Sequence, residues 1–271
     1  MTGVKIDMNI HDRFKDYKTI VIKVGTSTIT YPNGKLNLRM IERLCWMIAD
    51  LKNRDKNVVL VSSGAIGVGS KSLGFTERPQ KTREKQAAAA VGQAILMQIY
   101  QNFFNMYTHT IAQILLTRTD FEDENRRQNT ENTFDELLQR GIVPIVNAND
   151  TTSTYEIEFS DNDRLAANVA VLLKADLLIL LTDIDALYDS DPRVNPDAKR
   201  IKIVEEVTEE VEKMAGTAGS KFSVGGMATK ISAAKLCADK GIDMVIADGS
   251  DAEIIEKVID GDDVGTLFIG K

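Results

Sequence analysis

The chain has 271 residues, of which 43% are hydrophobic and 27% are charged, and its formal net charge is −7. A chain of this length can bury a large apolar core without disulfide or metal staples, and the acidic balance argues against a nucleic-acid-binding surface. No apolar run approaches the roughly 20 residues that a membrane-spanning helix needs, and segment 1–16 is too polar for a secretory signal. We therefore expect a protein that binds neither nucleic acid nor membranes.

Strand-like and helix-like patterns alternate along the whole chain. Short β-branched or apolar runs predict strands, and apolar residues at helical spacing predict helices. In chain order the pattern predicts a strand at 19–24, a helix at 37–53, a strand at 57–61, a helix at 86–107, a strand at 110–116, a helix at 125–140, a strand at 142–146, a helix at 162–173, a strand at 177–181, a helix at 227–240, a strand at 244–247, a helix at 253–259 and a strand at 266–269. We interpret the acidic stretch 205–212 as a solvated helix, and segment 151–159 as a hairpin or an irregular excursion.

The predicted strands are apolar throughout instead of alternating, which indicates a sheet buried on both faces. Strands separated by helices favour parallel βαβ units. We therefore predict an α/β fold, a three-layer αβα sandwich around a mostly parallel sheet, in a single domain over 1–271 with a soft division near Lys174. Cys45 and Cys237 lie in helix-like segments without C-x-x-C spacing, so we expect buried thiols and a reducing, cytoplasmic setting.

Ligands of open α/β sheets bind beyond the carboxyl ends of the strands. The predicted strand ends carry small or polar residues there, including Gly25, Ser62-Ser63-Gly64, Asn147 to Asp150 and Thr182-Asp183. Glycine turns at Gly25, Gly64 and Gly225-Gly226 precede helix-like segments, and helix openings of this kind suit phosphate. One such turn also fits a plain tight turn, but three in one chain favour a phosphate site.

Charged residues at these turns point to the same chemistry. Lys23 lies in an apolar strand, where burial without an anionic partner is costly, and a bound triphosphate would supply that partner. Lys230 follows the glycine pair on the first turns of a helix, where a solvated position is the alternative. Within Asp161-Asn162-Asp163 a helix N-cap accounts for one residue, and the carboxylates could orient lysines or hold an ammonium group.

Several familiar site motifs are missing from the sequence. There is no G-x-x-x-x-G-K-[ST] phosphate loop, no G-x-G-x-x-G dinucleotide turn and no G-x-S-x-G nucleophile elbow. The aspartates from Asp183 onward resemble a calcium loop, but Tyr188 and Val194 occupy its glycine and glutamate positions. His11 and His109 lie away from the predicted strand ends, so we expect no catalytic histidine.

Taken together, these residues resemble the amino acid kinase family over about 20–268. The motifs that carry the resemblance are at 22–27, 62–66, 149–150, 161–163, 181–183 and 225–230. Each motif is modest alone, but their order and number together are specific. The resemblance implies transfer of phosphate from ATP to the γ-carboxylate of L-glutamate, the first step of proline biosynthesis, with Mg²⁺ and without a metal site on the protein.

The resemblance also implies a role for each motif. Lys23 and Lys230 would contact the transferring phosphate, and Asp163 would hold and orient them. Acceptor-binding residues, in a lobe over about 1–174, would be Ser63, Asp150 and Asn162. Nucleotide-binding residues, mostly in a lobe over about 175–271, would be Lys23, Gly25, Thr182, Asp183, Val224, Gly225, Gly226, Met227, Ala228, Thr229 and Lys230. Ser223-Val224 replace the Gly-Thr that is usual in the family, which removes a hydroxyl beside the nucleotide.

Regulation and assembly also follow from the resemblance. Proline is the expected feedback inhibitor, and segment 149–159 is its expected site, because proline shares the α-carboxylate and α-ammonium groups of glutamate. We expect a homo-oligomer, and we expect the chain to lack the RNA-binding-like C-terminal domain that many family members carry.

Two other functions stay open on the residues alone. One is a sibling kinase that acts on another acid or on a nucleoside monophosphate, although Asp150 and Asn162 suit an ammonium group better than a phosphate. The other is a non-catalytic ligand sensor on the same fold, although binding alone would not need both Lys23 and Lys230.

Overall fold

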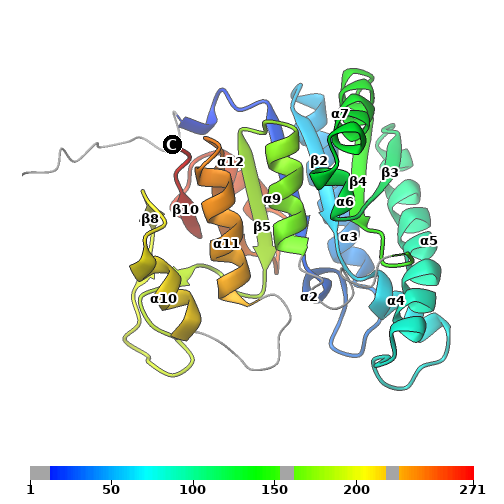
Figure 1. The fold of residues 1–271 in the computed structure, drawn as a ribbon, viewed down its shortest axis with the longest axis horizontal. Helices are drawn as coiled ribbons and strands as arrows, with labels where there is room; N and C mark the ends of the chain where they lie inside the picture. The colour runs from blue at the N-terminus through cyan, green and yellow to red at the C-terminus, as the bar shows by residue number, and fades with distance from the viewer. Residues whose placement is uncertain (1–12, 153–161, 218–225) are drawn as a thin grey trace, which may run out of the picture.

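The computed structural model describes residues 13–152, 162–217 and 226–271, and these build an eight-stranded sheet with helices on both faces (Figure 1). The order of its strands is β3 (Ile111–Leu116), β4 (Val143–Ala148), β2 (Asn57–Ser62), β1 (Thr19–Val24), β5 (Leu177–Thr182), β9 (Asp243–Asp248), β10 (Thr266–Phe268) and β8 (Ile203–Val204). Neighbours in this sheet are parallel except β10 and β9, which are antiparallel. A separate antiparallel pair joins β6 (Leu187–Tyr188) to β7 (Arg200–Ile201).

Ten described helices flank the strands or connect them. They are α2 (Thr26–Ile29), α3 (Leu38–Asn53), α4 (Ala65–Ser72), α5 (Thr82–Met106), α6 (Thr119–Glu122), α7 (Glu124–Gln139), α9 (Asn162–Leu172), α10 (Glu209–Thr217), α11 (Met227–Ala238) and α12 (Ile254–Ile259). None of the helices in the described part of the chain is both long and apolar enough to cross a membrane.

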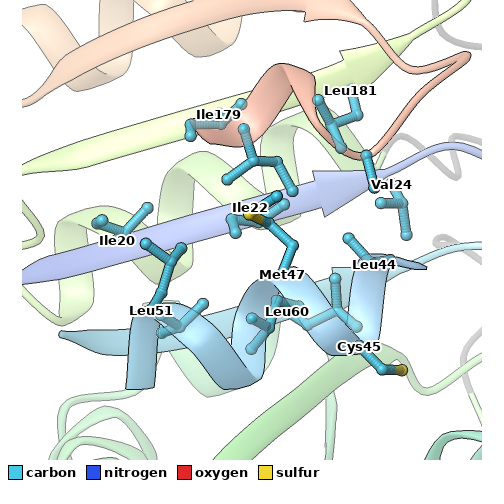
Figure 2. Packing of buried hydrophobic residues seen from close by; sticks show 14 of the residues in the cluster. Ile20, Ile22, Val24, Leu44, Cys45, Met47, Leu51, Leu60, Ile179 and Leu181 are labelled. Carbon is cyan, nitrogen blue, oxygen red and sulfur yellow. The ribbon is translucent and has the colours of Figure 1, made fainter. Parts of the chain in front are cut away.

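Two apolar clusters, one on each face of the sheet, confirm the three-layer prediction. Successive side chains of a strand point to opposite faces, so Ile20 and Ile22 of β1 pack against α3, α5 and α12, while Val21 faces α9 and α11. Figure 2 shows the first of these contacts, in which Leu44 and Met47 of α3 lie against β1. Burial of one such side chain stabilises the fold by roughly 1.5–3 kcal/mol, which explains why the strands are apolar throughout.

Both cysteines are buried and free, as the sequence predicts. Burial raises the pKa of each thiol above its ordinary value, so neither is a ready thiolate. Within the three described ranges, no group of three or more His, Cys, Asp or Glu side chains is placed so that it could hold a metal ion.

The structure corrects some of the predicted elements. Helix α5 begins at Thr82 instead of residue 86, and the acidic stretch becomes helical only from Glu209. Helix α4 is absent from the chain-order prediction because its glycines resemble a loop, although the turn at Gly64 was expected to precede a helix-like segment. It forms against α5 where Gly69 meets Gly92: a Cβ on Gly69 would lie 1.8 Å from the Ala88 carbonyl oxygen. Residues 153–159 of the expected irregular excursion lie outside the described residues.

Candidate active site

A cavity of about 740 Å³ opens at the carboxyl ends of the central strands. This volume is typical of small-molecule sites, and the edge of the sheet is the one that the strand-end argument predicts. The sequence-predicted site residues that line it are Lys23, Gly25, Ser63, Asp150, Asn162, Thr182, Asp183 and Lys230. Residues from both predicted lobes therefore share one cavity.

Asp163 joins the two predicted lysines beside this cavity. Its Oδ1 lies 2.6 Å from Lys23 Nζ, and its Oδ2 lies 3.0 Å from Lys230 Nζ. Strand β1 carries Lys23 near its end, while Asp163 and Lys230 stand on the first turns of α9 and α11. All three side chains are buried, with residue exposures of 0% for Asp163, 7% for Lys23 and 3% for Lys230. Burial of Lys23 in an apolar strand suggested a bound triphosphate as its anionic partner, whereas the family resemblance implied that Asp163 holds this lysine. In the structure Asp163 is an anionic partner of Lys23.

The charge of this Lys–Asp–Lys cluster is unbalanced. Burial alone would raise the pKa of Asp163, but the nearby ammonium groups, that of Lys23 first, hold it below its ordinary value. Asp163 is therefore an anion at neutral pH. Two ammonium groups share one carboxylate, so the three side chains together carry one excess positive charge, while Asp150 and Asp183 place carboxylates elsewhere on the cavity lining. Burial of such a cluster is costly, and an anionic ligand beside the two lysines would offset that cost.

Gly25 lies beside Lys23, and its missing side chain leaves room for about one methyl group there. Its φ of −76° is one that any residue adopts, so the turn itself does not require glycine. A Cβ at this position would lie 3.9 Å from Lys23 Nζ and would meet no atom closer than 3.7 Å. Gly64 differs, because its φ of +98° places it in the left-handed region, where glycine is favoured. A side chain at Gly25 would occupy the space in which a ligand could approach the ammonium group.

The predicted acceptor residues lie together on another wall of the cavity. Asn162 Nδ2 donates to Ser63 Oγ at 2.8 Å and to Asn147 Oδ1 at 3.0 Å. Asp150 lines the same cavity and is 7% exposed. This wall thus combines a carboxylate, a hydroxyl and an amide, which together suit a ligand with an ammonium group.

The predicted nucleotide residues are less uniformly placed. Thr182 and Asp183 follow β5 and line the cavity, with Thr182 Oγ1 3.0 Å from Asp183 Oδ1. Thr229 reaches the cluster through its hydroxyl, 3.1 Å from Asp163 Oδ2. Met227 packs into the apolar core, so its side chain does not face the cavity.

Gly226 and Ala228 lie at the beginning of α11, where Gly226 is the N-cap and Ala228 is exposed. Three of the predicted residues, Asp161, Val224 and Gly225, lie outside the described residues, as does the family departure at Ser223.

Sequence reasoning missed two cations on the outer wall, Lys71 and Arg78. Lys71 lies over Gly34, because a Cβ added to Gly34 would be 2.9 Å from the Cε atom of Lys71. Both residues are exposed, and both sit in or after the helix that was not predicted. Prediction of α4 would have placed Lys71 two turns from its start, near the cavity mouth.

Comparisons with known proteins show which family this chain resembles. The model of the amino acid kinase family matches residues 18–248. A glutamate 5-kinase of Clostridium perfringens is 54% identical over 95% of this chain and 97% of the relative, and one of Clostridium acetobutylicum is 52% identical over 97% and 99%. A glutamate 5-kinase of Thermoanaerobacter sp. is 51% identical over 92% of this chain but only 67% of its own length.

Proposed function

Because the chain belongs to the amino acid kinase family, we propose that it transfers the γ-phosphate of ATP to the γ-carboxylate of L-glutamate, the activity for which its glutamate 5-kinase relatives are named. The product, L-glutamyl 5-phosphate, begins proline biosynthesis. The observation that carries the proposal is the buried Lys–Asp–Lys cluster, whose surplus positive charge faces the same cavity as an acceptor wall suited to an amino acid.

The chemistry that this cluster would perform is electrostatic. Phosphoryl transfer depends on positioning and on stabilisation of the charge on the transferring group. Lys23 and Lys230 would stabilise that charge from two sides, and Asp163 would keep both ammonium groups in place without reorganisation. The acceptor carboxylate is already a nucleophile, so the reaction needs no general base.

The acceptor wall would orient glutamate for this attack. We assign the α-ammonium group of glutamate to Asp150 and Asn162, which offer a carboxylate and an amide oxygen, and we assign a further polar contact to Ser63. Gly25, Thr182 and Asp183 would border the nucleotide, together with segment 224–230. The absence of a side chain at Gly25, where a Cβ would lie 3.9 Å from Lys23 Nζ, supports close approach of a phosphate to that ammonium group.

Mg²⁺ fits this site as a partner of the nucleotide. Mg²⁺ in kinases is held by substrate phosphates and by one or two carboxylates, and it keeps several waters. Asp183 is a carboxylate that lines the cavity beside Thr182, and the ion would supply further positive charge for the phosphates. No larger set of protein ligands is needed for that role.

A coupled assay of ADP release tests the function. The acceptors are L-glutamate, L-aspartate, N-acetylglutamate and UMP, each with ATP and with or without Mg²⁺, and the Lys230→Met variant controls for contaminating kinases. UMP belongs in the panel because Lys71 and Arg78 add positive charge to the cavity wall. We expect L-glutamate with Mg²⁺ to give the fastest release, and faster release with any other acceptor would overturn the proposal.

Regulation by proline is part of the same proposal. Proline shares the α-carboxylate and α-ammonium groups of glutamate, so Asp150 could pair with either ligand. Proline should therefore raise the apparent KM for glutamate without lowering kcat. Initial rates against glutamate at several proline concentrations measure this, and inhibition that saturating glutamate does not relieve would indicate a separate site.

We also propose a homo-oligomer. Large apolar side chains are exposed on α3 and at the end of α5, with exposures of 51% for Leu38, 48% for Trp46 and 64% for Met106. Exposed apolar groups of this size are common at interfaces. Light scattering of the wild type and of Trp46→Lys measures the mass, and a monomeric wild type would exclude an oligomer.

A further inference from the structure

Three buried or half-buried amides form a hydrogen-bonded chain beneath the acceptor wall. Gln93 lies on α5, Asn147 lies near the end of β4, and Asn162 begins α9. Asn147 Nδ2 donates to Gln93 Oε1 at 2.9 Å, and Asn162 Nδ2 donates to Asn147 Oδ1 at 3.0 Å. Gln93 and Asn147 are 9% and 4% exposed. Asn147 and Asn162 line the cavity, whereas Gln93 lies behind them.

A backbone group fixes the direction of this amide chain. The N–H of Ala148 donates to Asn147 Oδ1 at 2.9 Å, and a backbone N–H can only donate. The oxygen of Asn147 must therefore face Ala148, and its NH₂ group must face Gln93. Gln93 Oε1 accepts the hydrogen bond from this NH₂ group. The Gln93 side chain therefore holds Asn147 in the orientation that the Ala148 N–H requires.

The orientation is passed on to Asn162. Since Asn147 presents its oxygen, Asn162 has to present its NH₂ group. That group donates to Asn147 Oδ1 and Ser63 Oγ, and a longer contact of 3.3 Å reaches the backbone oxygen of Ser62. The remaining polar atom is Asn162 Oδ1, to which no donor is bonded within the described ranges. An acceptor atom at the cavity wall suits the N–H groups of an ammonium ion.

We propose that Gln93 is a positioning residue of the acceptor site. It fixes Asn147 and thereby turns the oxygen of Asn162 towards the α-ammonium group of the acceptor. This inference rests on the proposed function, because it takes glutamate as the acceptor. Gln93 acts only through other residues. Its loss would leave the buried NH₂ group of Asn147 unpaired, which favours rearrangement of the chain of amides.

Replacement of Gln93 with methionine tests the inference, because methionine has a similar length and does not accept a strong hydrogen bond. We expect Gln93→Met to raise the KM for glutamate about tenfold, the scale of one hydrogen bond to a charged group. The KM for ATP should stay within about twofold. Gln93→Glu keeps an oxygen for Asn147 and should restore the KM for glutamate towards the wild-type value.

Tyr100→Phe is the matched control. Tyr100 lies on the same helix, is fully buried, and shares a 2.8 Å hydrogen bond with Ser62 Oγ outside the amide chain. This variant loses one buried hydrogen bond between α5 and a strand end, as Gln93→Met does. Its KM for glutamate should stay near the wild-type value, and an equal rise in both variants would show that Gln93 is only structural.

Glutarate, which is glutamate without its α-amino group, separates orientation from general damage. Its inhibition constant against glutamate should be nearly the same in the wild type and in Gln93→Met, because it has no ammonium group for Asn162 to meet. Equal weakening of glutarate and glutamate would overturn the inference. If Gln93→Met does not fold, Gln93→Asn, which is too short to reach Asn147, takes its place. A wild type without glutamate-dependent ADP release would instead disprove the proposed function.

Discussion

A buried aspartate lies at each end of the sheet, Asp163 on helix α9 and Asp243 on strand β9, and the two are partnered in different ways. Asp163 lies at the carboxyl end beside the cavity, and Asp243 begins β9 at the amino end. Both are essentially inaccessible, with exposures of 0% and 1%. Asp243 lies about 16 Å from the cavity end of β9, because five residues at about 3.3 Å per residue separate the two ends of this strand.

At Asp243 every charge is balanced. Arg13 binds the carboxylate through two nitrogens, and Tyr17 Oη and the backbone N–H of Gly270 donate to it at 2.6 and 2.7 Å. The carboxylate raises the pKa of Arg13 mainly through their hydrogen bond, and burial followed by the same carboxylate raises the pKa of Tyr17. This network ties the chain before β1 to the chain after β10.

At Asp163 the charges of the cluster are not balanced, because two ammonium groups share one carboxylate. In this protein, the buried charge that stabilises the fold is neutralised and fully hydrogen-bonded. A buried charge available for binding keeps an excess and adjoins a cavity.

The first prediction concerns the balanced end. Asp243→Asn leaves the half-buried Arg13 without its carboxylate, and loss of one partner of such a pair costs about 3–5 kcal/mol of unfolding free energy. Urea denaturation measures this loss, and kcat of the remaining folded enzyme should be unchanged. A large fall in kcat with normal stability would place Asp243 in the catalytic machinery and break the comparison.

The second prediction concerns the unbalanced end. Lys230→Met and Lys23→Met should each lower kcat by about 10²–10³-fold, the effect of removing one preorganised donor. Because the remaining lysine and Asp163 form a balanced pair, the unfolding free energy should change by no more than about 1 kcal/mol. Near-normal kcat, or destabilisation as large as that of Asp243→Asn, would contradict the assignment of the surplus charge to function.

The third prediction uses the nucleotide as a probe of the excess charge. ATP at about 100 times its Kd should stabilise the wild type by about 2.7 kcal/mol. Asp243→Asn should gain the same increment from the same ATP concentration, whereas Lys230→Met should gain clearly less. Thermal or urea unfolding with and without ATP measures the increments, and equal gains in all three proteins would show that Lys230 does not meet the nucleotide.

The fourth prediction concerns pH. The folded-state pKa of Asp163 lies below the ordinary value of 3.8, so its stabilising contribution is present above that value and is lost as pH falls through the folded pKa. The difference in unfolding free energy between wild type and Asp163→Asn should be constant from pH 8 to pH 5. Below pH 4 it should shrink by at most about 1.4 kcal/mol per pH unit. Shrinkage already above pH 5 would mean that Asp163 is not held as an anion.

Much of the fold and part of the site follow from local sequence patterns. Non-alternating apolar runs predicted the strands and the two-sided burial of the sheet, since a strand covered on both faces has no polar side. The type of most elements was right, and their ends shifted by a few residues, because helix ends depend on contacts such as those of α5. Lys23 in an apolar strand correctly indicated that a buried cation needs a partner.

The identity of the partners was decided by tertiary structure. Strand order places β1 between β2 and β5, and this order brings Lys23, Asp163 and Lys230 together from three distant elements. Helix α4 exists because two glycines permit its backbone to touch α5. Gln93 was missed although it shares the buried face of α5 with Gly92 and Tyr100, where a polar residue among apolar ones was the available signal. Local sequence patterns indicate which face of a helix or strand is buried. Which atoms meet at that face is determined by long-range packing, because the contacting segments are far apart in the chain and the local sequence of one does not specify the other.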